Sequence, residues 1–205
     1  MRRWLLRMSL VTEADLARAL AIAKRDFKNC GLYTAALERV PVRLTAAGEA
    51  YGYFSESGEI EIPAWSWSRL FEMHMGRACS LEDVVRHELA HALADQHMPL
   101  VDTPRFADVF GAAYWDEWLE DVRFDPMHYV TEYATTAPCE DYAETVMVYA
   151  RNRGRVSRFA ARHGVMRAFR WVADLACKLA PYRVIAPPPA RPRPVLARRA
   201  RRRAR

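Results

Sequence analysis

The chain has 205 residues, of which 51% are hydrophobic, and it carries a formal net charge of +6 at pH 7. This length and apolar content suffice to bury one hydrophobic core, and no apolar run approaches the length of a transmembrane helix. The four cysteines are scattered and form no C-x-x-C pair. They therefore argue against a disulfide framework and against a zinc site made of cysteines.

The first residues, MRRWLLRMSLV, contain basic residues and leucines but no uninterrupted apolar stretch. Arg7 interrupts the run, Glu13 and Asp15 follow it closely, and a small-residue cleavage site of the secretory type is missing. Scattered cysteines also suit the reduced thiols of a cytosol. We therefore expect a cytoplasmic protein.

Residues 12–29 have the pattern of an amphipathic helix used for packing. Thr12 and Asp15 have the spacing of a capping box at its start, and Gly31 can end it. Residues 40–63 then change to an alternating pattern with glycine-containing turns, which predicts a small antiparallel sheet. Its last strand, residues 58–63, either forms the rim of a cleft, where an extended peptide can pair with it, or is purely structural.

The stretch SLEDVVRHELAHALADQHM, residues 80–98, combines several helix signals. Ser80 and Asp83 have capping-box spacing, and acidic residues occupy the first turn. Pro99 marks the expected end of the helix. A hydrophobic stripe at helical spacing predicts a face toward the core, formed by Leu81, Val84, Val85, Leu89 and Leu93.

This predicted helix carries an HExxH motif, formed by His87, Glu88 and His91. Residues four apart lie on one helix face, so the two imidazoles can share one zinc ion. Glu88 lies beside them, where its carboxylate can accept a proton from water. The pattern also arises by chance in ordinary helices, but here it lies on a well-signalled one. It is typical of half the site of a zinc metallopeptidase.

A second informative stretch, YATTAPCEDYAE, spans residues 133–144. Pro138 suits the first turn of a helix, and the acidic residues after it favour a helix start. Glu140 and Glu144 are four apart and share a face. That face is either a solvated acidic surface or one that turns toward the HExxH helix. In the second case a His₂Glu site closes, with its fourth position open for water.

The two motifs together resemble those of gluzincin zinc metallopeptidases of the anthrax lethal factor type. They also resemble a bacterial family of zinc-binding metallopeptidases whose second motif reads much like EDYAE. The resemblance covers about residues 58–150 and rests on two short motifs. It implies a zincin-like fold with one Zn²⁺ per chain, held by the two motif histidines and Glu140, and Glu88 as general base. It further implies that Glu144 supports the site from behind the ligands and that Tyr133 assists the substrate carbonyl.

His97 offers a competing third ligand, because residues 87–97 read HExxHxxAxxH. Metzincins have glycine where this chain has Ala94, and glycine permits the sharp turn that returns the third histidine to the metal. On a continuous helix His97 lies about 120° around the axis from His91 and cannot reach the same ion. We therefore prefer Glu140 and keep a metzincin-like site with His97 as the alternative.

Residues 151–180 predict two more helices, broken around Gly154 and Gly164. Residues 181–205 then hold six of the 12 prolines and nine arginines, without any acidic residue. We expect this segment to be a disordered basic tail appended to a single domain of residues 1–180. Charge alone would let such a tail bind nucleic acid or an anionic surface.

The sequence thus predicts an α+β fold, with a small antiparallel sheet packed on the HExxH helix and a mostly helical C-terminal half. The expected function is zinc-dependent hydrolysis of a peptide or protein substrate. The alternative is a non-catalytic module, either a zinc-stabilised adaptor or a nucleic-acid-binding protein that acts through its tail. Intact Glu88 favours the enzyme, since a structural zinc site needs no general base and usually has four protein ligands.

Overall fold

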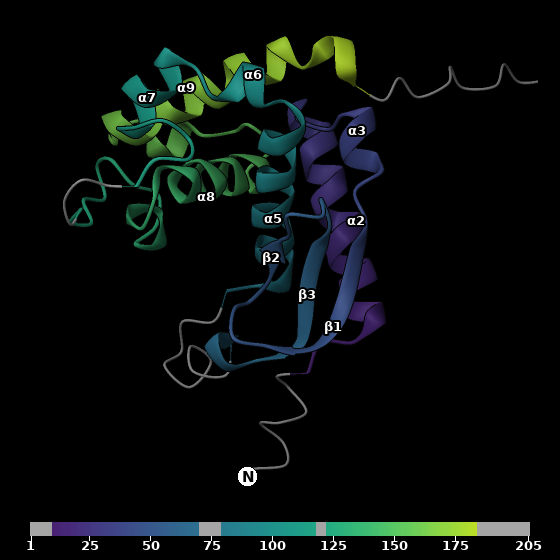
Figure 1. Ribbon diagram of the computed structural model, residues 1–205. Coiled ribbons are helices and arrows are strands. Elements are labelled where there is room, and N and C mark those ends of the chain that lie inside the picture. Colours follow the sequence, from purple (N-terminus) through teal and green to yellow (C-terminus); the bar gives the residue numbers. More distant parts are fainter. Residues whose placement is uncertain (1–9, 70–78, 118–121, 184–205) are drawn as a thin grey trace, which may run out of the picture.

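The computed structural model describes residues 10–69, 79–117 and 122–183 and confirms an α+β arrangement (Figure 1). Most of the expected basic tail and the first nine residues lie outside these ranges. None of the helices in the described part combines the length and apolarity needed to cross a bilayer. The strands are β1 (Val42–Gly48), β2 (Tyr53–Phe54) and β3 (Ile60–Ser66). The α-helices are α2 (Glu13–Cys30), α3 (Ala35–Glu38), α5 (Leu81–Gln96), α6 (Met98–Val101), α7 (Pro104–Phe110), α8 (Pro138–Arg151) and α9 (His163–Lys178).

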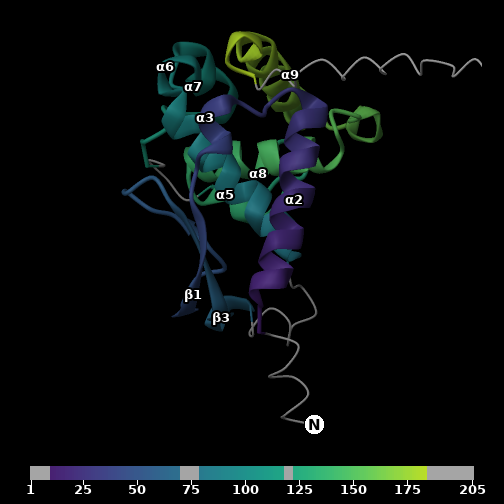
Figure 2. The ribbon, with the colours of Figure 1, turned by 90° about the vertical axis from the view of Figure 1, so that its right-hand side faces the viewer.

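Helix α5, which carries the HExxH motif, lies at the centre of the fold (Figures 1 and 2). It contacts α2 and α8 as well as β2 and β3. Its side chains from Asp83 to Ala94 are buried, apart from the half-buried His91. A helix enclosed on several sides holds its polar side chains in fixed positions, because its neighbours restrict their rotamers.

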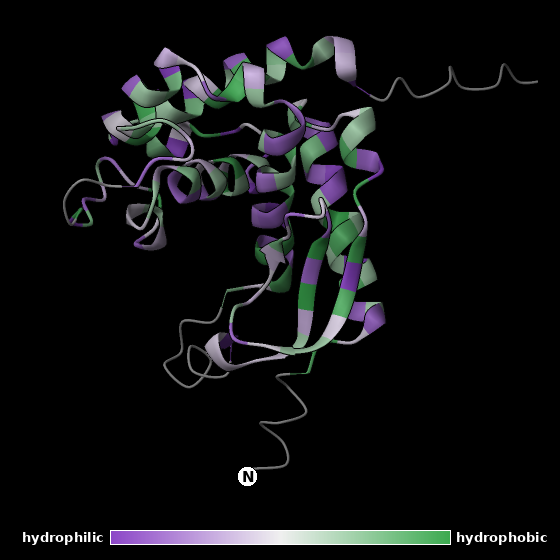
Figure 3. Cartoon of the chain, in the orientation of Figure 1, coloured by the Kyte–Doolittle hydropathy of each residue, from purple (hydrophilic) through white to green (hydrophobic). Residues whose placement is uncertain are grey.

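The sheet is mixed, so the prediction of an antiparallel sheet is wrong. β1 pairs with β3 in parallel, and β2 pairs with the other edge of β3 in antiparallel fashion. Alternation predicts strands but not their partners, and both β1 and β3 show it (Figure 3). Residues 49–52 cross the end of β3 and do not turn back beside β1. Ser66, Ser68 and Arg69 hold this crossing segment by hydrogen bonds to its carbonyl groups.

The helix starts follow the capping signals of the sequence. Thr12 and Asp15 form a complete capping box on α2, which ends at Gly31 with φ of 78°. On α5, the hydroxyl of Ser80 accepts a hydrogen bond from the amide of Asp83. The Asp83 carboxylate, however, bonds to two arginines and leaves the expected box half-formed.

Those arginines belong to a buried ion network that joins α2, α5 and the end of α8. Arg86 donates to Asp26 Oδ2 from Nη2 over 2.7 Å and to Asp83 Oδ1 from Nη1 over 2.6 Å. Arg151 binds the second oxygen of Asp83, and Arg153 binds the second oxygen of Asp26. Because Arg86 directly precedes His87, the network fixes the helix next to the motif.

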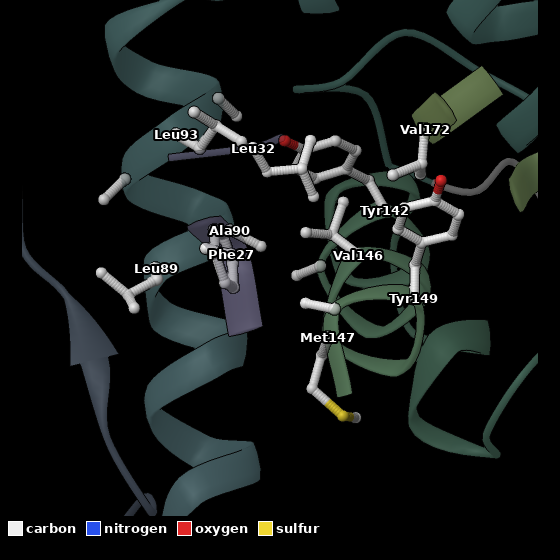
Figure 4. Packing of buried hydrophobic residues seen from close by; sticks show 14 of the residues in the cluster. Phe27, Leu32, Leu89, Ala90, Leu93, Tyr142, Val146, Met147, Tyr149 and Val172 are labelled. Carbon is white, nitrogen blue, oxygen red and sulfur yellow. The ribbon is translucent and has the colours of Figure 1, made fainter. Parts of the chain in front are cut away.

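The apolar core between α5 and α8 sets the distance between these two helices (Figure 4). Tyr142 and Val146 of α8 are fully buried on the side that faces α5, whereas the fully buried Leu89 lies on the face of α5 that points away from α8. Phe27 of α2 closes the same cluster. Burying each of these side chains contributes roughly 1.5–3 kcal/mol. This packing places the first turn of α8 opposite the motif.

The C-terminal half departs from its prediction at one helix start. α9 begins at His163, so Gly164 lies in its first turn and does not break a helix. A Cβ on Gly164 would lie 2.6 Å from His128 Cδ2 and 2.9 Å from the carbonyl oxygen of Met127. Gly164 therefore allows the start of α9 to pack closely against Met127 and His128, and it does not interrupt a helix.

Replacing Arg86 with alanine is expected to destabilise the fold strongly, because it leaves two buried aspartates without their shared partner. Breaking a buried ion pair costs about 3–5 kcal/mol. Urea denaturation measures the loss in free energy of unfolding. Arg18→Ala is the control, since the Arg18 side chain is 63% exposed and its ion pair with Asp15 should be worth no more than about 1 kcal/mol. Equal losses in the two variants would contradict the account.

Candidate metal centre

Three metal-binding side chains from two helices meet at one point. His87 Nε2 lies 3.0 Å from His91 Nε2 and 3.0 Å from Glu140 Oε2, and His91 Nε2 lies 3.5 Å from Glu140 Oε2. The histidines come from successive turns of α5, and Glu140 comes from the first turn of α8. The acidic face predicted at residues 140–144 therefore turns toward the HExxH helix and not toward solvent.

The chemistry of these three atoms fits a metal ion. In a tetrahedral site with metal–ligand distances of about 2.0–2.1 Å, ligand atoms lie about 3.3 Å apart, close to the distances found here. Glu140 Oε2 is buried and has no hydrogen-bond partner of acceptable geometry, even though His87 Nε2 is near. A buried oxygen without a partner is costly unless a cation binds it. The group formed by His87, His91 and Glu140 could thus hold a metal ion.

Glu144 contacts Nδ1 of His87, the ring nitrogen that does not face His91 and Glu140. His87 Nδ1 lies 2.7 Å from Glu144 Oε1, and the hydroxyl of Thr131 donates to Glu144 Oε2 over 2.7 Å. The carboxylate can only accept, so Nδ1 carries a proton, and Nε2 is the nitrogen that can offer a lone pair once a metal ion displaces its own proton. The supporting contact predicted for Glu144 is therefore present, whereas Thr131 follows no recognisable spacing in the sequence.

The outer nitrogen of His91 is held by a residue that the sequence did not reveal. His91 Nδ1 lies 2.9 Å from the hydroxyl of Tyr114, which follows α7 in the chain. Burial raises the pKa of Tyr114 far above its usual value, so the phenol stays neutral. No sequence motif pairs a tyrosine at this position with the HExxH histidines, and only the fold brings them together.

Mutual contacts shift the pKa values of His87 and Glu140 in opposite directions. Burial raises the pKa of Glu140, but contacts with His87 and His91 outweigh it and hold that pKa well below its usual range. Burial lowers the pKa of His87, whereas its contacts with Glu140 and Glu144 raise it to about 10. A metal ion must displace the proton that His87 would otherwise carry, so metal affinity should fall as the pH falls.

Glu88 is buried next to this group and faces the chain segment before β2. Burial raises the pKa of Glu88, and the neighbouring histidines lower it. A Cβ on Gly52 would lie 2.6 Å from Ile62 Cδ1 and 3.3 Å from Glu88 Oε1. Glycine therefore lets the backbone pass closely over Glu88, a close approach that the sequence alone did not indicate.

Two cavities that share lining residues form a cleft at the candidate metal site, and the second one is lined by His87, His91 and Glu140. Their volumes are about 490 and 360 Å³, and both are lined by Gly52, His87, Glu88 and Tyr133. The second one also reaches the end of α5 at Asp95. The short strand β2, an edge strand of the sheet, borders it with Tyr53 and Phe54.

Tyr133 lines both cavities and is exposed to solvent. It lies in the 3₁₀ turn Tyr133–Thr135 just before α8, and its side chain is 54% exposed. The centre of its ring is 5.8 Å from that of His87.

His97 is not part of the group, which contradicts the metzincin-like alternative. It ends α5, which stays helical through Ala94 and Gln96. Its Nε2 lies 3.3 Å from the hydroxyl of Thr34, and its ring packs on Tyr182. Without a glycine at position 94 the helix continues past the point where a metzincin chain turns back, so His97 points to a different part of the molecule.

Comparison of the chain with family models, with curated proteins and with solved structures finds no match. The site is therefore defined by its own residues and their geometry.

Replacing Glu140 with glutamine is expected to remove the metal, because a neutral amide binds a divalent cation far more weakly than a carboxylate. Metal content after dialysis against a chelator measures this, with circular dichroism to verify folding. His97→Gln is the matched control and should retain about one ion per chain, as the wild type should. Metal loss in His97→Gln together with retention in Glu140→Gln would reverse the assignment.

Proposed function

We propose that this protein is a zinc-dependent peptidase of the gluzincin type with a zincin-like fold. The observation that carries the proposal is a buried glutamate, Glu88, beside a three-ligand group that opens into a cleft. Structural zinc sites are usually closed by four protein ligands and have no use for a general base. A site with three ligands and a free position suits catalysis.

Zinc is the metal that this donor set favours. Two imidazole nitrogens and one carboxylate oxygen are the ligands of catalytic zinc sites, which keep a fourth position open. His87, His91 and Glu140 would hold the ion. When bound, zinc supplies Lewis acidity, which brings the pKa of water to near neutral and polarises a carbonyl group.

Glu88 would move the proton during peptide-bond hydrolysis. Its buried carboxylate accepts a proton from the attacking water and then donates it to the nitrogen of the departing amine. The burial that raises the pKa of Glu88 makes the carboxylate a stronger base for the first step. A carboxylic acid is still acidic enough to give the proton to an amine nitrogen in the second step.

Tyr133 would stabilise negative charge on the substrate carbonyl. Partial burial and the charges of Glu140 and Glu88 raise its pKa far above the usual value, so the phenol keeps its proton. A neutral phenol at the mouth of the cleft can donate a hydrogen bond to the developing oxyanion.

The cleft suits an extended peptide or protein substrate. The cavity lined by all three candidate ligands and the neighbouring cavity, which meets them at His87, leave room for several substrate residues. β2 is an edge strand, and edge strands offer main-chain groups with which an extended segment can pair.

Glu88→Gln is expected to keep the metal but lower peptidase activity by about 10²–10⁴-fold, because an amide cannot accept the proton. Cleavage of a mixed library of fluorogenic peptides measures activity, and elemental analysis measures zinc. Glu82→Gln, in the first turn of the same helix, serves as the control and should cleave like the wild type. Full activity in Glu88→Gln would disprove the mechanism, and a wild type that binds zinc without cleaving would favour a non-catalytic adaptor.

A further inference from the structure

The two histidines of the metal-binding group are supported differently. His87 Nδ1 contacts the carboxylate of Glu144, whereas His91 Nδ1 lies 2.9 Å from the hydroxyl oxygen of Tyr114. We propose that Tyr114 is a positioning residue of the metal centre, whose hydroxyl accepts a hydrogen bond from His91 Nδ1 and so aims His91 Nε2 at the ion. This inference rests on the metal site of the proposed function and adds a residue to it.

The direction of the hydrogen bond follows from the other side of the ring. His91 Nε2 faces His87 Nε2 at 3.0 Å and Glu140 Oε2 at 3.5 Å, where a metal ion requires a lone pair. A neutral imidazole carries one proton, so that proton must then be on Nδ1. The Tyr114 oxygen is the acceptor within reach of it. Without this acceptor, the ring can flip or carry its proton on the wrong nitrogen.

Tyr114 is held firmly enough to fix the ring. Its side chain is only 2% exposed, and its ring centre lies 5.7 Å from that of Phe106 and 5.6 Å from that of Tyr142. Its backbone amide donates to Asp102 Oδ1 over 3.3 Å. The aromatic packing and this backbone contact together place the hydroxyl with little freedom to move.

A phenol has a further advantage over a carboxylate at this position. The site already contains the carboxylates of Glu88, Glu140 and Glu144. A further negative charge directly behind His91 would reduce the ability of a bound divalent ion to polarise its ligands. A neutral acceptor orients His91 without this effect.

The same aromatic cluster provides a matched control. Tyr142 is fully buried beside Tyr114, but its hydroxyl has no hydrogen-bond partner among the described residues. Tyr114→Phe and Tyr142→Phe therefore each remove one buried hydroxyl from one cluster, and only Tyr114→Phe removes a contact with a proposed metal ligand.

The experiment measures zinc affinity of both variants and of the wild type by competition with a chromophoric chelator. Loss of a residue that orients a ligand typically costs 10–100-fold in metal affinity, so Tyr114→Phe should weaken zinc binding by about tenfold or more. Tyr142→Phe should bind zinc like the wild type. The absorption spectrum of cobalt-loaded protein should change in Tyr114→Phe alone, because the environment of one ligand has changed.

Wild-type affinity in Tyr114→Phe would overturn the inference while leaving the metal site intact. Equal weakening in both variants would also overturn it, because packing and not the hydrogen bond would then support the site. A wild type that binds no zinc would show that the metal site itself is wrong, and the proposed function would fail with it.

Discussion

The rest of the site depends on one electrostatic constraint. Two imidazole nitrogens and one carboxylate oxygen lie 3.0–3.5 Å apart in a buried position. Lone pairs this close repel one another unless a cation or a proton lies between them. The free energy to hold them together must come from the fold, chiefly from the packing of α5 against α8 and from the ion network around Arg86. Because the fold already holds the three ligand atoms in place, a metal ion can bind them without a rearrangement of the site.

The two histidines are also held in place through their Nδ1 atoms, which point away from the candidate metal position. Glu144 and Thr131 orient His87, and Tyr114 lies against His91. These partners come from the segment before α8, from α8 itself and from the chain after α7. The candidate site therefore depends on segments that packing already fixes, since the ring of Tyr114 lies against Phe106 of α7 and Tyr142 of α8. In front of the ligands, Gly52 allows the backbone to close over Glu88 and shapes the cleft.

Local signals predicted much of this arrangement. The caps at Thr12 and Ser80, the i, i+4 spacing of the histidines and the proline at the start of α8 act within a few residues, and the structure follows them. Long-range features escaped prediction. Strand alternation does not encode a partner, so the parallel pairing of β1 with β3 was missed. Tyr114 was missed for the same reason, since its contact with His91 spans 23 positions and leaves no periodic trace.

We propose above that His87, His91 and Glu140 bind one zinc ion. Crystals of zinc-loaded protein, with diffraction data recorded on both sides of the zinc absorption edge, test it most directly. We expect one anomalous peak about 2.0–2.2 Å from His87 Nε2, His91 Nε2 and a Glu140 carboxylate oxygen. Zinc bound elsewhere, for example at His97, with no peak between α5 and the start of α8, would contradict it.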